Sequence, residues 1–132
     1  MNVFIDTSIF LDVALKRGGF KDSLIVLNAA QKGLFNGFIA DITLLNIAYI
    51  AQKQLKDVNN FIAQINQSFT VAGADNNTFA NALSLQNKDL EDAVQYVCAQ
   101  ERDCDIIVTN DKGFYMGKIP VLNAKTFIKQ YA

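Results

Sequence analysis

A chain of 132 residues is long enough to bury a substantial hydrophobic core without disulfides or metals, and this length implies one domain over residues 1–132. Hydrophobic residues make up 51% of the chain and charged residues 19%, which excludes a disordered protein and favours a compact globular one. The net charge of -1 excludes a global basic field, so any binding of nucleic acid has to use a local patch.

Short apolar segments alternate with helical patterns along the whole chain. Gly18-Gly19 and Gly33 mark helix ends, while Asp41 or Thr43, and further on Asp57, are candidate helix caps. In chain order we expect strand 2–5, helix 8–18, helix 21–32, strand 38–40, helix 41–54, helix 57–68, strand 70–72, helix 77–85, helix 89–101, strand 106–109, strand 121–122 and a helix from residue 124. This alternation predicts an α/β fold, a three-layer α/β/α sandwich with a central, mainly parallel sheet of four or five short strands.

Histidine is missing from the sequence, and its absence removes several classes of site. The Ser-His-Asp and Cys-His nucleophile systems and most zinc sites need histidine, so carboxylate chemistry remains. Cys98 falls on the apolar face of its expected helix and is predicted to be a buried thiol. Reduced cysteines, a beginning unlike a secretory signal and the lack of a long apolar stretch predict a cytoplasmic protein with no membrane partner.

Three aspartates lie where apolar segments start or stop. Asp6 follows the apolar run 3–5, Asp111 comes shortly after the run 106–108, and Asp92 lies at the start of helix 89–101. Ligands of open α/β sheets collect outside the carboxyl ends of the strands, so we expect Asp6 and Asp111 at one crevice. The helix that carries Asp92 runs directly into the strand before Asp111 and can bring its first turn to the same place.

Each aspartate also has a structural explanation. Asp6 fits a helix N-cap, Asp89 fits the N-cap of the helix that contains Asp92, and Asp111 is a common turn residue. Their joint placement favours a site, because clustered carboxylates repel one another unless a cation or protons neutralise them. Oxygen ligands suit Mg²⁺ or Mn²⁺, and such a site favours cleavage of a phosphodiester.

Four blocks of sequence, taken together, resemble the PIN domain family. They are residues 6–8 (Asp-Thr-Ser), 42–46 (Ile-Thr-Leu-Leu-Asn), 91–93 (Glu-Asp-Ala) and 108–114 (Val-Thr-Asn-Asp-Lys-Gly-Phe). The resemblance implies a fold like that of the 5′ nucleases, and many members are Mg²⁺-dependent ribonuclease toxins of the VapC type. By position, Asp6, Asp92 and Asp111 match the metal-binding acids of the family, which implies that they are the catalytic residues.

Asn46 departs from the family pattern, in which most catalytic members have a glutamate. Asparagine offers one neutral carbonyl oxygen and adds no negative charge to offset a cation. Its surroundings resemble a branch of the family with asparagine at this position. Asp89 and Glu91, which lie close to Asp92 in the sequence, are candidates to supply the missing charge, with a capping role as the simpler explanation of Asp89.

Other side chains near these acids are candidates for contact with metal-bound water or with phosphate. They are Thr7, Ser8, Thr109 and Asn110, with capping and turn formation as their alternative roles. Lys112 is the best-placed cation for an RNA phosphate, although exposed lysines usually only improve solubility. Asp12 is most simply a solvated residue of the first helix.

Three interpretations of the function remain. The first is a Mg²⁺-dependent endoribonuclease that acts as a toxin, with RNA as substrate and an antitoxin protein as partner. The second is a catalytically impaired PIN-like module that binds nucleic acid or a protein, as Asn46 would suggest. The third is a phosphoacceptor receiver domain, which fits less well because Asp6 has no acidic neighbour and the strand 70–72 ends at Ala72-Gly73.

The resemblance also implies a homodimer, since PIN toxins are commonly homodimers. Four isoleucines could supply the interface or belong to the core. They are Ile47, Ile50, Ile62 and Ile65.

Overall fold

The computed structural model describes residues 1–131 as an alternation of short strands and helices. The strands are β1 (Asn2–Ile5), β2 (Asn36–Ala40), β3 (Thr70–Ala72), β4 (Ile106–Val108) and β5 (Val121–Leu122). The helices are α1 (Thr7–Ala14), α2 (Phe20–Gln31), α3 (Asp41–Ala51), α4 (Val58–Ser68), α5 (Asn76–Ser84), α6 (Leu90–Glu101) and α7 (Ala124–Tyr131). The expected order of elements is confirmed, although the helices expected over 8–18 and 41–54 end earlier.

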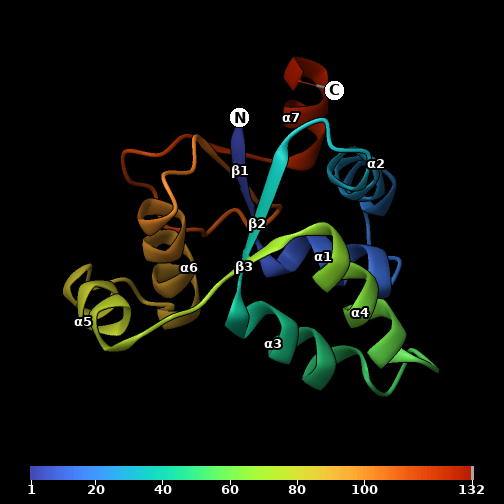
Figure 1. The fold of residues 1–132 in the computed structure, drawn as a ribbon, viewed down its shortest axis with the longest axis horizontal. Coiled ribbons are helices and arrows are strands. Elements are labelled where there is room, and N and C mark those ends of the chain that lie inside the picture. The colour runs from blue at the N-terminus through green and yellow to red at the C-terminus, as the bar shows by residue number, and fades with distance from the viewer. Residues whose placement is uncertain (132) are drawn as a thin grey trace.

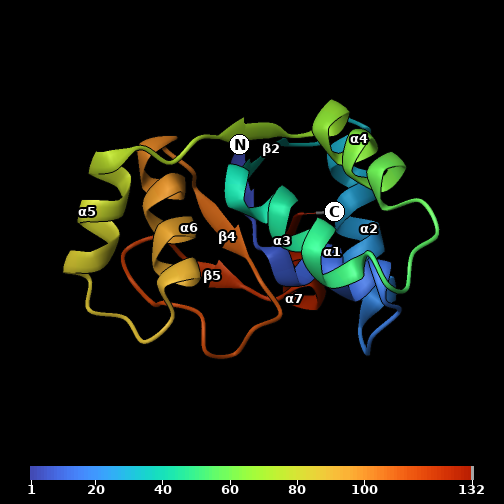
Figure 2. The same ribbon diagram turned by 90° about the horizontal axis from the view of Figure 1, so that it is seen from below.

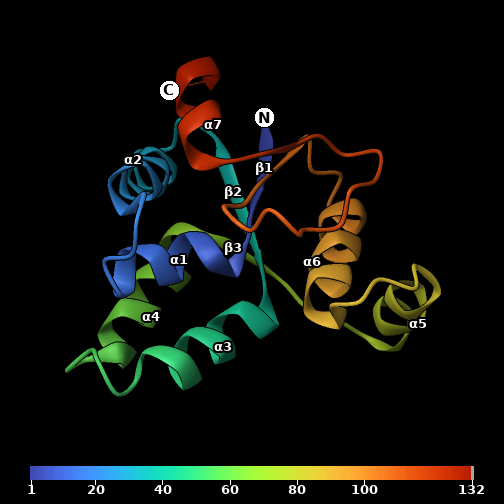
Figure 3. The same cartoon turned by 180° about the vertical axis from the view of Figure 1, so that it is seen from behind.

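The five strands form one sheet in the order β3-β2-β1-β4-β5, and every neighbouring pair is parallel. Helices α5 and α6 lie on one side of this sheet, while α1, α2, α4 and α7 lie on the other (Figure 1). The view from behind shows the same division into layers (Figure 3). The predicted three-layer α/β fold is therefore confirmed.

Alternate side chains of the strands fill two cores on opposite faces of the sheet. Val3 and Ile5 of β1 pack against α1, α2, α4 and α7, together with the buried Phe127 of α7. Phe4 of β1 and Ile107 of β4 pack against α6. Because successive residues of a strand point to opposite faces and helices cover both faces, these strands read as unbroken apolar runs.

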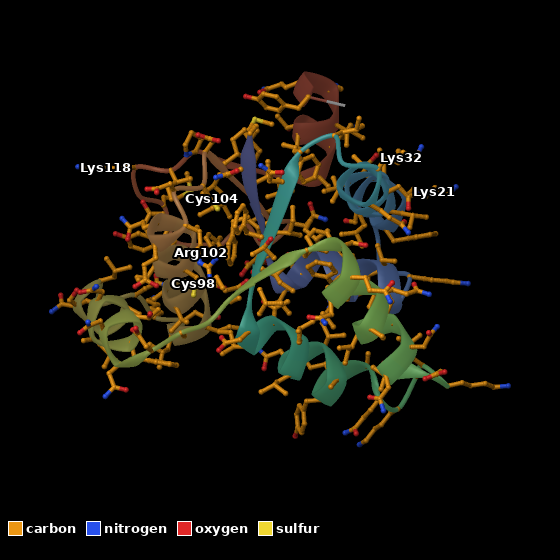
Figure 4. All side chains as sticks on the ribbon, in the orientation of Figure 1. Lys21, Lys32, Cys98, Arg102, Cys104 and Lys118 are labelled. Carbon is orange, nitrogen blue, oxygen red and sulfur yellow. The ribbon has the colours of Figure 1, made fainter. Side chains whose placement is uncertain are left out.

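Several residues whose burial was in question from the sequence lie in these two cores. Ile47 and Ile65 are buried in the core beneath α1 and α2, so they belong to the core and not to a dimer surface. Cys98 and Cys104 are buried beside α6, as Figure 4 shows, and burial raises the pKa of each thiol to about 12. Within residues 1–131, no helix is long and apolar enough to span a membrane.

The carboxyl ends of the strands lie on the side of the molecule where α3 begins, which is the side that faces the viewer in Figure 2. From β1 the chain passes through α1 and α2 to β2, which is the neighbour of β1 on one side. From β4 it passes to β5, which lies on the other side. The direction of winding therefore changes between β1 and β4, and this is where open α/β sheets form their ligand crevice.

Candidate catalytic and metal site

The crevice between β1 and β4 contains a hollow of about 440 Å³ with an acidic lining. Its carboxylates come from the end of β1, the helix α1, the first turn of α6 and the loop after β4. They are Asp6, Asp12, Asp89, Glu91, Asp92 and Asp111. The three aspartates singled out from the sequence are thus brought together with Asp89 and Glu91 at the carboxyl edge of the sheet.

Asp6 is fixed by both of the strands that flank the crevice. Its backbone N–H donates to the Val108 carbonyl at 2.9 Å, which continues the pairing of β1 with β4. Its carboxylate Oδ2 accepts the Ser8 N–H at 3.2 Å, which makes Asp6 the N-cap of α1. The same oxygen accepts the Thr109 hydroxyl at 2.7 Å. Asp6 is 3% exposed, so it caps the helix while it also faces the hollow.

Thr109 connects the two sides of the crevice through hydrogen bonds. Its Oγ1 donates to Asp6 and accepts the Asp111 backbone N–H at 3.0 Å. The Asp111 carboxylate in turn accepts the Gly113 N–H at 2.9 Å and remains exposed. The roles predicted for Thr109 and Asp111 in a turn are therefore present, and they aim the Asp111 side chain at the rim of the hollow.

The first turn of α6 carries the remaining acids. Asp89 is the N-cap, and its carboxylate accepts the Asp92 N–H at 3.2 Å. The Asp92 side chain is 5% exposed, and burial raises its pKa from 3.8 to about 8. Neighbouring charges add to this effect, as does a hydrogen bond with Asp111 that favours the protonated carboxyl; the charges belong to Asp6, Asp89 and Asp111.

Glu91 is half-buried in the same turn, and burial also raises its pKa. The side chains of Thr7 and Asn46 lie close enough to hydrogen bond with Glu91 and oppose this rise. Asn46 lies on α3 behind the carboxylate and does not line the hollow itself. Glu91 therefore occupies the space in front of the residue that departs from the family pattern.

A buried glutamine, which the sequence analysis missed, joins three helices behind the site. Gln95 Oε1 accepts the Thr7 N–H at 3.2 Å and lies 3.5 Å from the Thr43 hydroxyl. Its Nε2 donates to Glu91 Oε2 at 3.5 Å. Thr7 and Thr43 also share a hydrogen bond of 3.0 Å between their hydroxyls. The sequence feature that could have identified Gln95 is its position one helical turn after Glu91, on the buried face of α6.

Asn110 ties the loop after β4 to three helices. Its Nδ2 donates to Asp12 Oδ2 at 2.8 Å and to Ser23 Oγ at 3.0 Å. Its Oδ1 accepts the Ala124 N–H at 3.1 Å, at the start of α7. The expectation that Asp12 is solvated is wrong, because this amide and Arg17 bind both oxygens of a carboxylate that is 8% exposed.

Lys112 lies outside the acidic hollow. It lines a second hollow of about 330 Å³, which shares Asn110 and Asp111 with the first. The basic side chain at the acidic hollow is Arg17, which the sequence analysis did not single out. The sequence feature that could have identified Arg17 is the turn that follows the first helix, Lys16-Arg17-Gly18-Gly19.

The donor set fits a hard divalent cation, because it consists of carboxylate, hydroxyl and amide oxygens, with no imidazole and no thiolate. Burial is the main cause of the raised pKa of Asp92, and the neighbouring negative charges that add to it are charges that a cation would neutralise. Among the residues from 1 to 131, no three acidic or cysteine side chains converge closely enough to form a ready-made metal centre. Binding of an ion would therefore include rearrangement of these side chains.

Comparison with known proteins agrees with this geometry. The sequence model of a family described as PIN domain matches residues 2–113. Ribonuclease VapC1 of Aquifex aeolicus (strain VF5) is 25% identical over 145 residues, an alignment that covers 98% of this chain and 94% of the relative.

Solved structures share the fold at lower identity. A toxin-antitoxin complex from Klebsiella pneumoniae has a TM-score of 0.69 at 20% identity, over 92% of this chain and 97% of that one. VapBC2 from Rickettsia felis, bound to a DNA fragment from its promoter, has a TM-score of 0.69 at 16% identity, over 93% and 98%. VapC20 from Mycobacterium tuberculosis, a toxin that cleaves the sarcin-ricin loop, has a TM-score of 0.67 at 12% identity, over 85% and 92%.

Proposed function

The chain belongs to the PIN domain family, and from this premise we propose that it is a metal-dependent endoribonuclease that cleaves phosphodiester bonds of RNA. The observation that carries the proposal is the convergence of Asp6, Asp92 and Asp111 on one hollow at the switch point of the sheet. Carboxylates gathered in this way repel one another unless a cation or protons offset their charge. The name of the relative from Aquifex aeolicus, a ribonuclease, supports RNA as the substrate.

Asp6, Asp92 and Asp111 are the residues that would hold Mg²⁺ or Mn²⁺. A divalent ion bound there supplies an activated water and neutralises the charge that develops on the leaving oxygen. The chain contributes positioning: Thr109 holds the Asp6 carboxylate at 2.7 Å and the Asp111 backbone at 3.0 Å. Asp89 fixes the first turn of α6, and Lys112 offers a cation for RNA phosphate on the far side of Asp111.

Glu91 supplies the negative charge that Asn46 lacks. It lines the hollow from α6, beside the side chain of Asn46 on α3. The donor Nε2 of Gln95, 3.5 Å from Glu91 Oε2, directs the carboxylate from behind. The pair of Asn46 and Glu91 would then present to a cation the charge that one glutamate on α3 presents in most catalytic members of the family.

The partners follow from the relatives. The solved neighbours from Klebsiella pneumoniae and Rickettsia felis are complexes of a toxin with an antitoxin, so an antitoxin protein is the partner of this chain. The chain acts as the toxin in the cytoplasm and forms a homodimer. Exposed apolar side chains on α3 offer a surface for the second copy, and they are Leu45, Tyr49 and Ile50.

A module that binds nucleic acid or protein without cleavage is the second candidate, and Asn46 is the observation that favours it. With an amide on α3, the carboxylates that remain would have to bind the ion without the usual fourth acid. The two candidates differ in whether the natural protein turns over RNA.

Calorimetric titration with Mg²⁺ and with Mn²⁺, together with an RNA-cleavage assay, tests the proposal on a matched pair of variants. Asp6→Asn removes one charge from the hollow but keeps an oxygen that accepts from Thr109 and Ser8. Asp103→Asn removes one charge just past the C-cap of α6, about 16 Å from Asp92 by the rise of the helix, at an exposed position where asparagine tolerates the positive φ. We expect Asp6→Asn to lose metal binding and cleavage, and Asp103→Asn to keep both.

Cleavage that survives unchanged in Asp6→Asn would reject the proposed site. Absence of metal binding and of cleavage in the natural protein would favour the second candidate. Cleavage that first arises in Asn46→Glu would then identify an impaired catalytic site. Glu91→Gln should weaken metal binding if this carboxylate contributes the fourth charge.

A further inference from the structure

Arg17 is the one basic side chain that lines the acidic hollow, within the part of the chain that the structure describes. A carboxylate-lined hollow repels a nucleic-acid backbone, so a phosphate brought to it needs a cation in addition to any metal. Lys112, the cation favoured by the sequence, faces the neighbouring hollow beyond Asp111. Arg17 and Lys112 therefore line two neighbouring hollows that share Asn110 and Asp111.

The backbone fixes Arg17 through the turn that ends α1. Leu15 is the C-cap, and Lys16 has a left-handed φ of 51°. The Lys16 N–H donates to the Val13 carbonyl at 3.4 Å, and the Arg17 N–H donates to the Asp12 carbonyl at 3.0 Å. These two bonds form a Schellman motif, which places Arg17 two residues past the cap in a defined orientation. The Arg17 carbonyl then accepts the Phe20 N–H at 3.0 Å, at the start of α2.

The side chain of Arg17 is held by the same residue as its backbone. Its Nε lies 3.2 Å from Asp12 Oδ1, while the other oxygen of Asp12 accepts Asn110 Nδ2 at 2.8 Å. Asn110 is the neighbour of Asp111 and is itself bound to Ser23 and to the start of α7. Arg17 is thus linked through two hydrogen-bonded side chains to the loop that carries a candidate metal ligand.

This arrangement leaves the end of the guanidinium available for a ligand. Within residues 1–131, Asp12 is the only ion-pair partner of Arg17, and the contact of 3.2 Å is made through Nε. The Arg17 side chain is 48% exposed. A guanidinium that is oriented by one nitrogen presents the other two in the fork geometry that matches a phosphate.

We infer that Arg17 binds a backbone phosphate of the RNA strand next to the carboxylate cluster, and that the Schellman turn, Asp12 and Asn110 are the positioning elements that aim it. This inference rests on the proposed function and adds a binding residue to that site. The RNA strand would pass over Asp111, which the hollow that contains Arg17 shares with the hollow that contains Lys112.

The test compares Arg17→Ala and Arg17→Lys with Lys32→Ala, which removes the same charge elsewhere. Lys32 follows the last residue of α2, and Figure 4 shows it on the outer side of that helix. It is about 18 Å along the helix from the Arg17 turn, well beyond the screening length at physiological salt. Two quantities are measured in the presence of Mg²⁺: the Kd of a fluorescein-labelled 2′-O-methyl oligoribonucleotide, checked to be intact, and kcat and KM for a single-stranded RNA.

We expect Arg17→Ala to weaken binding of the oligoribonucleotide about tenfold, which corresponds to the loss of one charge-assisted contact. The dependence of log affinity on log salt should become less steep by about 0.7, the value for one phosphate of a single strand. KM should rise more than kcat falls, Arg17→Lys should recover part of the affinity, and Lys32→Ala should stay within about twofold of the natural protein.

Equal effects of Arg17→Ala and Lys32→Ala on Kd and on the salt dependence would overturn the inference, as would an oligoribonucleotide that the natural protein does not bind. A natural protein that binds the oligoribonucleotide through Arg17 but cleaves no RNA would reject the proposed catalysis and leave the inference standing. Cleavage of RNA that does not depend on Arg17 would support the proposed catalysis and overturn the inference. The thermal midpoint of each variant confirms that the exposed side chain was replaced without loss of the fold.

Discussion

The ionised carboxylate of Asp92 destabilises the metal-free folded protein. Its carboxyl is buried beside other carboxylates, so its folded-state pKa, about 8, lies far above the usual value of 3.8. Between these two values the folded protein binds a proton that the unfolded chain releases. The contribution of this group to stability therefore falls as pH rises from about 4 to about 8, and it is unfavourable above that range.

Asp92→Asn should for this reason stabilise the metal-free protein at pH 8 and have little effect at pH 5, where the natural carboxyl is already neutral. The same change should abolish cleavage, since the amide adds no negative charge for a cation. Thermal unfolding in the presence of EDTA at the two pH values measures the first effect. An equal loss of stability at both pH values would show that Asp92 serves the fold and not the site.

Single residues also show where the sequence was sufficient and where it was not. Asp6, Asp92 and Asp111 could be placed at one crevice because parallel strands end at the same edge of a sheet. The buried state of Asp12 could not be predicted, because its partner Asn110 is far away in the sequence. Arg17 was missed for the same reason, since its orientation depends on Asp12.

At the scale of elements, the strands were predictable, but the ends of helices α1 and α3 were not. Each strand is a short apolar run because helices cover both faces of the sheet, and this pattern is visible in the sequence. Helix α1 was expected to continue to the glycines at 18 and 19, yet it ends at Ala14. The reason is that Lys16, a residue that rarely adopts a positive φ, takes the left-handed position of the cap.

The helices α1, α3 and α6 depend on one shared polar contact, which Gln95 makes in the protein interior. Gln95→Leu would keep the volume but leave the Thr7 N–H without its acceptor, while the Thr43 hydroxyl would keep only its bond with the Thr7 hydroxyl. We expect a loss of about 2 kcal/mol in the free energy of unfolding, because a buried donor would be left unsatisfied. Urea denaturation measures this loss.

The control is Gln100→Leu, which changes the same side chain at an exposed position of the same helix. It should alter the free energy of unfolding by less than about 0.5 kcal/mol. If both variants behave alike, the contact behind the site contributes nothing specific. A larger loss in Gln95→Leu, accompanied by weaker metal binding, would show that this contact also orients Glu91.

At the scale of the whole molecule, the site is assembled from segments far apart in the chain. The loop after β1, the first turn of α6 and the loop after β4 all meet at the point where the sheet changes its direction of winding. Because the edge is formed by the sheet itself, the backbone holds these acids near one another before any ligand binds, and binding of an ion would then adjust their side chains. Helix α3 begins at this edge and carries the two most exposed large apolar side chains within residues 1–131, Leu45 and Tyr49.

Leu45 and Tyr49 are 73% and 78% exposed and lie one turn apart on α3. An apolar pair so exposed is a candidate for contact with another chain, and the proposed homodimer would cover it. Leu45→Asp should therefore weaken dimerisation at least about tenfold, because a charge would be buried without a partner. Sedimentation velocity over a range of concentrations measures the change.

The matched control is Leu83→Asp on α5, where the leucine is 62% exposed on the opposite side of the sheet. It introduces the same charge on a comparably exposed helix, so a nonspecific effect on association would appear in both variants. A natural protein that is monomeric at every concentration would reject the homodimer. Dimers weakened only by Leu83→Asp would move the interface from α3 to α5.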